Sequence, residues 1–217
     1  MEANIQIDLK DMMLNKLKED DPETYSKIIL FQKIAKIDEI IKNRYSISFL
    51  LDAFFAFEKG SLNIDTVMYE IKFLEGLEQT SRTKKATQFR RPPLKGLWHK
   101  HYFDGSISVL AQNVKNALDS YDMPYFENMV NEVKASGEER FVTPEDVPHI
   151  VNDVVTLNLQ RRRNDQKTTG EWLVYAIHEN VNYFLCLAKH SEEDAQIRSK
   201  IDSSCIYEFS FLKSILP

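Results

Sequence analysis

Apolar residues recur every three or four positions over most of the chain up to residue 163, which is the spacing of amphipathic helices. Helices are expected over residues 5–17, 21–43, 46–59, 63–77, 106–118, 125–134, 145–163 and 191–201. The pair Asp21-Pro22 supports the second of these, because an Asp side chain accepts from the free N–H groups at a helix start and proline fits the first turn. Helix therefore dominates the predicted secondary structure.

The C-terminal fifth of the chain has a different pattern. Two runs of eight aromatic and β-branched residues, 171–178 and 183–190, flank the short polar stretch 179–182. Runs of equal length about a short polar turn predict an antiparallel hairpin. Pairing the runs about that turn places His178 opposite Tyr183.

A further apolar run, 205–212, predicts a third strand beside the hairpin 171–190. The predicted fold class is α+β, with a mainly helical N-terminal portion and a small three-stranded antiparallel sheet at the C-terminus. Three regions are expected along the chain: a helical portion 1–79, an exposed basic loop 80–95 and an α+β portion 96–217.

Composition agrees with a helical globular protein. Six Gly and seven Pro in 217 residues are few for an all-β fold, and 43% hydrophobic residues suffice for a core without disulfides. Cys186 and Cys205 both lie in apolar runs, which is typical of free thiols in a reducing compartment. The sequence shows no basic leader and no run of about 20 apolar residues, so we expect a cytoplasmic protein without a membrane span.

Charge is distributed unevenly along the chain, whose net charge is −5. Residues 79–103 carry seven Lys or Arg and no acid, so the remainder carries a net charge of −12. The seven cations are Arg82, Lys84, Lys85, Arg90, Arg91, Lys95 and Lys100. A segregated positive segment of this kind attracts phosphates or an acidic protein partner.

Two histidines at the end of this segment, His99 and His101, lie in a stretch whose residues alternate with period two. This stretch is either a short strand or the entry from a strand into a helix. A strand would place both imidazoles on one face about 7 Å apart. A metal would need a further ligand that the sequence does not place, so no metal is expected. The alternative is acid-base chemistry, in which one imidazole takes a proton and another returns one.

His178 with Tyr183 is a second candidate for such chemistry, as a base oriented by a phenol. If His178 met His99 or His101 in a cleft, Arg90 or Arg91 beside them would suit attack of a ribose 2′-OH on its phosphate. The catalytic candidates are therefore His99, His101, His178 and Tyr183.

Aromatic residues are interleaved with the cations, and rings of this kind stack on unpaired bases while Lys and Arg neutralise phosphates. The expected nucleic-acid or phosphate contacts are Arg82, Lys84, Lys85, Arg90, Arg91, Lys95, Trp98, Lys100 and Tyr102, with Phe89 as a further stacking candidate. The sequence contains no GxxxxGK[ST], GxGxxG, GxSxG or HExxH motif, so no cofactor is expected.

Two functions are consistent with these features. The first is a cytoplasmic protein that binds nucleic acid, RNA rather than DNA, and cleaves it without a metal. The order of helix 145–163, hairpin, short helix and strand is similar in general terms to small bacterial ribonuclease toxins of the toxin-antitoxin or phage-defence type, a fold-level analogy without a motif. The second is a non-enzymatic interaction module of the immunity, antitoxin or adaptor type, whose basic loop docks an acidic protein partner.

Overall fold

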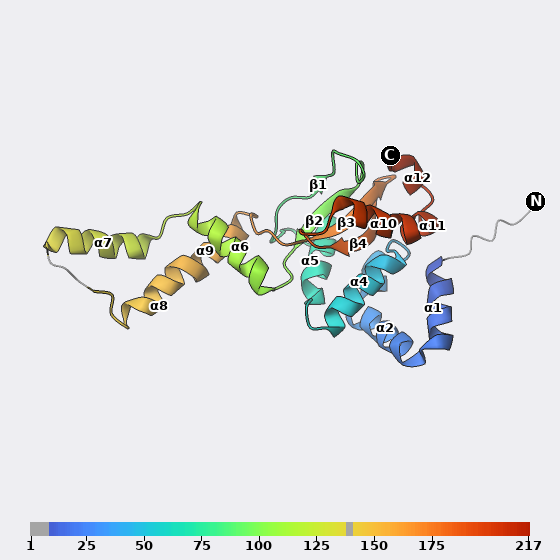
Figure 1. Ribbon diagram of the computed structural model, residues 1–217, viewed down its shortest axis with the longest axis horizontal. Coiled ribbons are helices and arrows are strands. Elements are labelled where there is room, and N and C mark those ends of the chain that lie inside the picture. The colour runs from blue at the N-terminus through green and yellow to red at the C-terminus, as the bar shows by residue number, and fades with distance from the viewer. Residues whose placement is uncertain (1–8, 138–140) are drawn as a thin grey trace, which may run out of the picture.

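The computed structural model describes residues 9–137 and 141–217, in which a four-stranded antiparallel sheet lies between two groups of helices (Figure 1). Its strands are β1 (Thr87–Gln88), β2 (Trp98–Tyr102), β3 (Glu171–His178) and β4 (Val181–Ala188), paired in the order β1-β2-β3-β4. The α+β class is confirmed. The sheet has four strands rather than three, because β1 and β2 come from the middle of the sequence, and helices occur along the whole chain.

One face of the sheet is covered by the N-terminal helices, which are α1 (Leu9–Asp20), α2 (Pro22–Ile34), α3 (Ile37–Ile41), α4 (Ile47–Glu58) and α5 (Ile64–Leu74). Ser46 caps α4 by accepting from the backbone N–H of Phe49 at 3.0 Å. Phe49 is then buried against Phe184 of β4 in the larger hydrophobic cluster. The helix expected over 21–43 is divided into α2 and α3, because Lys36 has a φ of 53°. Residues 5–8 of the first expected helix lie outside the described part.

The opposite face is covered by the C-terminal segments, which are α10 (Asp194–Lys200), a π-helical turn (Ile201–Cys205), α11 (Ile206–Glu208) and α12 (Leu212–Ile215). The strand predicted over 205–212 is therefore wrong. Ile197, Ile201 and Cys205 recur every four residues and bury their side chains in the second cluster with Val174 of β3. The run buries its apolar side chains from a helical continuation of α10 rather than from a strand.

The predicted hairpin is confirmed, but its register is different. The turn consists of two residues, Glu179 and Asn180, whose φ angles of 51° and 62° are those of a type I′ hairpin turn. His178 therefore lies opposite Val181, and Tyr183 lies opposite Ala176. The predicted pairing of His178 with Tyr183 is wrong because it assumed a four-residue turn.

Between β2 and β3 the chain forms a helical arm, residues 104–170, which projects from the sheet-containing part (Figure 1). Its elements are α6 (Ile107–Leu118), α7 (Pro124–Ser136), α8 (Asp146–Val151), a π-helical segment (Asn152–Leu157) and α9 (Asn158–Asn164). The helices α6 and α9 form its neck beside the sheet, whereas α7 and α8 form its tip. Among the described residues, no helix is long and apolar enough to cross a membrane.

Candidate functional site

The strand β2 presents different chemistry on its two faces, because successive side chains of a strand alternate. Trp98 and Tyr102 belong to the hydrophobic cluster on the side of the N-terminal helices, and Lys100 is fully buried on that side. His99 and His101 point to the other face, where their rings are 5.6 Å apart. Of the two alternatives left open by the sequence, the segment adopts the strand, and both imidazoles lie on one face.

These two histidines belong to a group of five rings, which we term the histidine–tryptophan cluster: Phe89, His99, His101, Trp172 and His190. His101 stacks on His190 with centroids 5.2 Å apart and planes 21° apart. Trp172 lies 4.9 Å from His99 and 4.5 Å from His190, and Phe89 lies 4.6 Å from His99. The cluster thus joins residues from the basic segment, β2, β3 and the segment after β4.

His101 is fixed by the backbone at the start of β3. Its Nδ1 lies 2.8 Å from the carbonyl oxygen of Gly170, which can only accept, so the proton lies on Nδ1 and leaves Nε2 as an acceptor in the neutral ring. Gly170 approaches β2 very closely: a Cβ there would lie 1.8 Å from the carbonyl oxygen of Tyr102. Glycine at this position allows β3 to pass close enough to β2 to hold the ring.

Burial controls the charge of the two β2 histidines. Desolvation, with a smaller contribution from His190, lowers the pKa of His99 to about 4. Desolvation also lowers the pKa of His101 to about 4, partly opposed by the hydrogen bond to Gly170 and aided by the neighbouring imidazoles and Lys84. Both rings are therefore neutral at pH 7 and pack as uncharged rings.

Two polar atoms of the cluster have no partner among the described residues. Trp172 Nε1 and His99 Nδ1 are shielded from solvent, and neither makes a hydrogen bond within the part of the chain that the structure describes. An unsatisfied buried donor costs about 1–3 kcal/mol.

A pocket adjoins the cluster where the arm meets the sheet, with a volume of about 390 Å³. It is lined by polar side chains from the basic segment, α6, β3 and the segment after β4, including Lys84, Ser108, Gln112, Asn116, Glu171 and His190. The α6 wall is held in place by Asn113, which is fully buried and exchanges hydrogen bonds of 2.8 and 2.9 Å with the backbone of Thr169. Hydrogen bonds within the neck therefore hold this wall of the pocket in place.

The basic segment is anchored by a buried ion pair. Lys100 Nζ lies 3.1 Å from Glu70 of α5, and both side chains are almost fully buried. The same ammonium donates to Ser81 Oγ at 2.6 Å, to Thr83 Oγ1 at 2.7 Å and to the Lys84 carbonyl at 2.5 Å. Lys100 thus holds residues 81–84 against the sheet, and the expectation that it contacts phosphate is wrong because its charge is enclosed.

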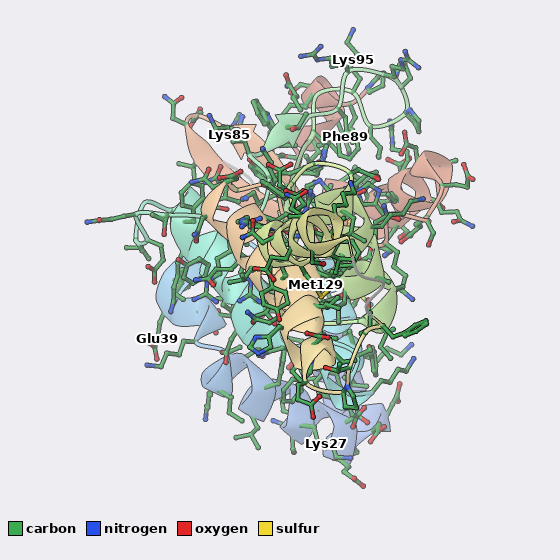
Figure 2. All side chains as sticks on the ribbon, turned by 90° about the vertical axis from the view of Figure 1, so that its left-hand side faces the viewer. Lys27, Glu39, Lys85, Phe89, Lys95 and Met129 are labelled. Carbon is green, nitrogen blue, oxygen red and sulfur yellow. The ribbon has the colours of Figure 1, made fainter. Side chains whose placement is uncertain are left out.

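The other six cations of the segment are exposed: Arg82, Lys84, Lys85, Arg90, Arg91 and Lys95. Figure 2 shows Lys85, Phe89 and Lys95 toward the same end of the molecule, away from Lys27. Arg82 stacks on Tyr69 at 4.2 Å. Tyr102 is buried and Trp98 packs against the helical side, so neither ring is placed for stacking beside these cations.

The histidines expected to cooperate are not brought together. His178 lies at the far end of β3, four residues beyond the partner of His99 and thus about 13 Å along the strand. It stacks on Phe211 at 4.2 Å with planes 2° apart, and Tyr183 lies 6.4 Å away. No hydrogen bond joins His178 and Tyr183 among the described residues, and both rings pack on Phe211 of the C-terminal segment.

The structure instead adds Trp172 and His190 to His99 and His101. The alternation in β2 and β3 contained part of this signal, since Trp172 and His101 are register partners. His190 follows β4, and no pattern along the chain predicts that it joins β2. Over residues 9–137 and 141–217, no group of three or more His, Cys, Asp or Glu side chains is arranged to hold a metal.

The chain matches no protein-family model, no curated protein and no solved structure.

Proposed function

We propose that this protein binds single-stranded nucleic acid, RNA in the first instance, across the histidine–tryptophan cluster and the exposed cations beside it. One observation carries the proposal: the rings of the histidine–tryptophan cluster, on one face of the sheet, adjoin a segment that has six exposed cations and no acid. Base–ring stacking with a flanking positive groove is the usual way in which proteins hold single strands.

The charge state of the cluster favours binding over cleavage. Cleavage by two imidazoles needs one of them to be charged so that it can return a proton. His99 and His101 have pKa values of about 4, so both are neutral at pH 7. Neutral rings stack on bases without losing the solvation of a charge.

The neck pocket supplies polar groups next to the rings. Gln112 donates to Asn116 Oδ1 at 2.8 Å, which leaves its own amide oxygen and the Asn116 amide nitrogen for other partners. Lys84 at the same pocket supplies a positive charge. We infer that one nucleotide of the bound strand enters the pocket, with its phosphate near Lys84 and its base against His190.

Docking of an acidic protein partner is the second candidate function, and it is favoured by the same exposed cations. It requires the charges but not the rings. The two functions therefore differ in their dependence on Trp172.

The test is fluorescence anisotropy with a short labelled single-stranded RNA of mixed sequence. Trp172→Ala should weaken binding about tenfold or more, the range for loss of one stacked base. Arg90→Ala/Arg91→Ala should weaken binding at low salt. Phe55→Ala, an exposed ring on α4, and Lys16→Ala/Lys33→Ala serve as matched controls and should leave binding unchanged.

Three outcomes would refute parts of this proposal. The absence of salt-sensitive RNA binding at micromolar protein contradicts it entirely. Binding that is lost with the arginines but indifferent to Trp172 leaves a charge-only surface, as the protein-docking function requires. RNA cleavage that disappears in His99→Ala/His101→Ala would restore a catalytic role for those two residues.

A further inference from the structure

The described part of the helical arm lacks a hydrophobic core of its own. Among its described residues, 104–137 and 141–170, Ala117 is the one buried apolar side chain, and neither hydrophobic cluster includes any residue of the arm. The helix α7 buries no residue at all. Helices of 12 or 13 residues are marginally stable in water without tertiary packing, so a stable arm needs a surface to pack against.

Apolar side chains are exposed along the whole length of the arm. They include Ile107 at 84% exposure near the neck and Val147 at 48% and Val151 at 51% near the tip. On α6, Ile107, Leu110 and Leu118 follow the helical repeat and form one stripe. Nine of the 19 exposed large apolar residues in the described chain lie in the arm, which makes up under a third of it. A concentration of this kind marks an interaction surface.

Charge differs between the two ends of the arm. At the tip, the described residues 119–137 and 141–160 include five exposed acids and one exposed lysine, Lys134. The acids are Asp119, Asp122, Glu127, Glu132 and Glu145. At the neck, residues 104–118 and 161–170 carry Lys115, Arg161, Arg163 and Lys167 outside the core, against Asp104 and Asp165. The arm is therefore negative at its tip and positive at its neck.

We propose that the arm packs against the arm of a second copy of this chain in antiparallel orientation. An antiparallel pair places each acidic tip against the basic neck of the other copy, whereas a parallel pair would place acid against acid. The twofold symmetry makes the contact self-complementary, so that each tip-to-neck contact occurs twice. The apolar stripe of α6 in one copy then covers the apolar side chains of α7 and α8 in the other.

The arrangement fits the shape of the molecule, because the arm projects away from the sheet and leaves its sides open (Figure 1). Figure 2 looks toward the tip and shows Met129 of α7 at the near end, in front of the sheet-containing part. The segment from α8 to α9 spans 19 residues, or about 28 Å, which is the length over which two arms can pair. This inference does not rest on the proposed nucleic-acid function.

The test is the mass of the full chain in solution by sedimentation velocity, together with a charge exchange. The wild type should be a dimer at micromolar concentration. A tip reversal, Glu127→Lys/Glu132→Lys, and a neck reversal, Lys115→Glu/Arg163→Glu, should each weaken the dimer at least tenfold. Combining both reversals should restore the dimer, because tip and neck then attract again with opposite signs. Lys16→Glu/Lys33→Glu on α1 and α2 is the matched control.

Circular dichroism of each variant separates loss of association from loss of folding. A wild-type monomer over the whole concentration range overturns the inference. A dimer that neither reversal weakens, or that the combined reversal fails to restore, overturns the antiparallel arrangement. RNA binding by a monomeric wild type would leave the proposed function standing without the dimer.

Discussion

His101 on β2 and His190 after β4 stack ring on ring, with centroids 5.2 Å apart and planes 21° apart. The contact closes the histidine–tryptophan cluster, because His190 also lies 4.5 Å from Trp172. It joins the segment after β4 to β2 across β3.

Stability should fall as pH falls from about 6.5 to about 4. The pKa of His99 and of His101 is lowered to about 4 in the folded chain from 6.5, so the unfolded chain binds more protons in this window. The stabilisation is complete above pH 6.5 and is lost toward pH 4, at roughly 3 kcal/mol for each histidine at most. Urea unfolding at pH 7 and pH 5 measures it. His99→Gln/His101→Gln should be less sensitive to pH than the wild type, and an equal pH dependence would contradict the burial argument.

Lys100→Met should destabilise the fold by about 3–5 kcal/mol, because it leaves the carboxylate of Glu70 buried without its ammonium partner. Urea unfolding measures the loss. Lys100→Met/Glu70→Met should recover part of it, since no charge is then buried. In both variants, hydrogen exchange at the amides of residues 81–84 should be faster. If Lys100→Met were as stable as the wild type, the ion pair would not stabilise residues 81–84.

Gly170→Ala should destabilise the fold by about 3 kcal/mol or more, because the added Cβ would lie 1.8 Å from the Tyr102 carbonyl oxygen. The strands β2 and β3 must then separate, which also displaces His101. Gly60→Ala is the control: its Cβ meets no atom within 4 Å, and only its φ of 66° costs about 1–2 kcal/mol. Thermal unfolding of both variants tests the difference, and equal losses would contradict it.

RNA binding should depend steeply on salt. Single strands lose affinity with a slope of about −0.7 in log K against log salt for each phosphate neutralised, so six exposed cations give a slope of at most about −4. Arg90→Ala/Arg91→Ala should make the slope about 1.4 less steep. Trp172→Ala should lower affinity with the slope unchanged, because stacking releases no ions. A slope altered by Trp172→Ala would contradict this division of roles.

Local patterns were sufficient to predict most helices and the hairpin, and they left the segment with His99 and His101 open between a strand and a strand-to-helix entry. The cap predicted at Asp21 forms, because a side-chain oxygen near free N–H groups acts within one turn. The run 205–212 was wrongly predicted as a strand, because its apolar spacing fits either a strand or a helix and the sheet face selects the helix. Short-range spacing does not determine that choice.

The site was harder to predict than the fold. The burial of Lys100 depends on Glu70, Ser81 and Thr83, which meet it only when α5 packs against β2. Because the turn at Glu179-Asn180 has two residues, His178 is not the strand partner of Tyr183. The spacing of apolar residues does not determine the length of a turn. His190 joins His101 through the order of the strands, which the sequence does not specify. The exposed cations, by contrast, were predicted because their charge alone favours solvent.

The most direct test of the central claim uses the fluorescence of Trp172. The chain has two tryptophans, so in Trp98→Phe all indole emission comes from Trp172 in the cluster. Titration with single-stranded RNA should quench that emission saturably, with the same midpoint as binding measured by anisotropy, because a base stacks on the indole. Emission that stays constant while RNA binds would contradict the claim that the histidine–tryptophan cluster is the binding surface.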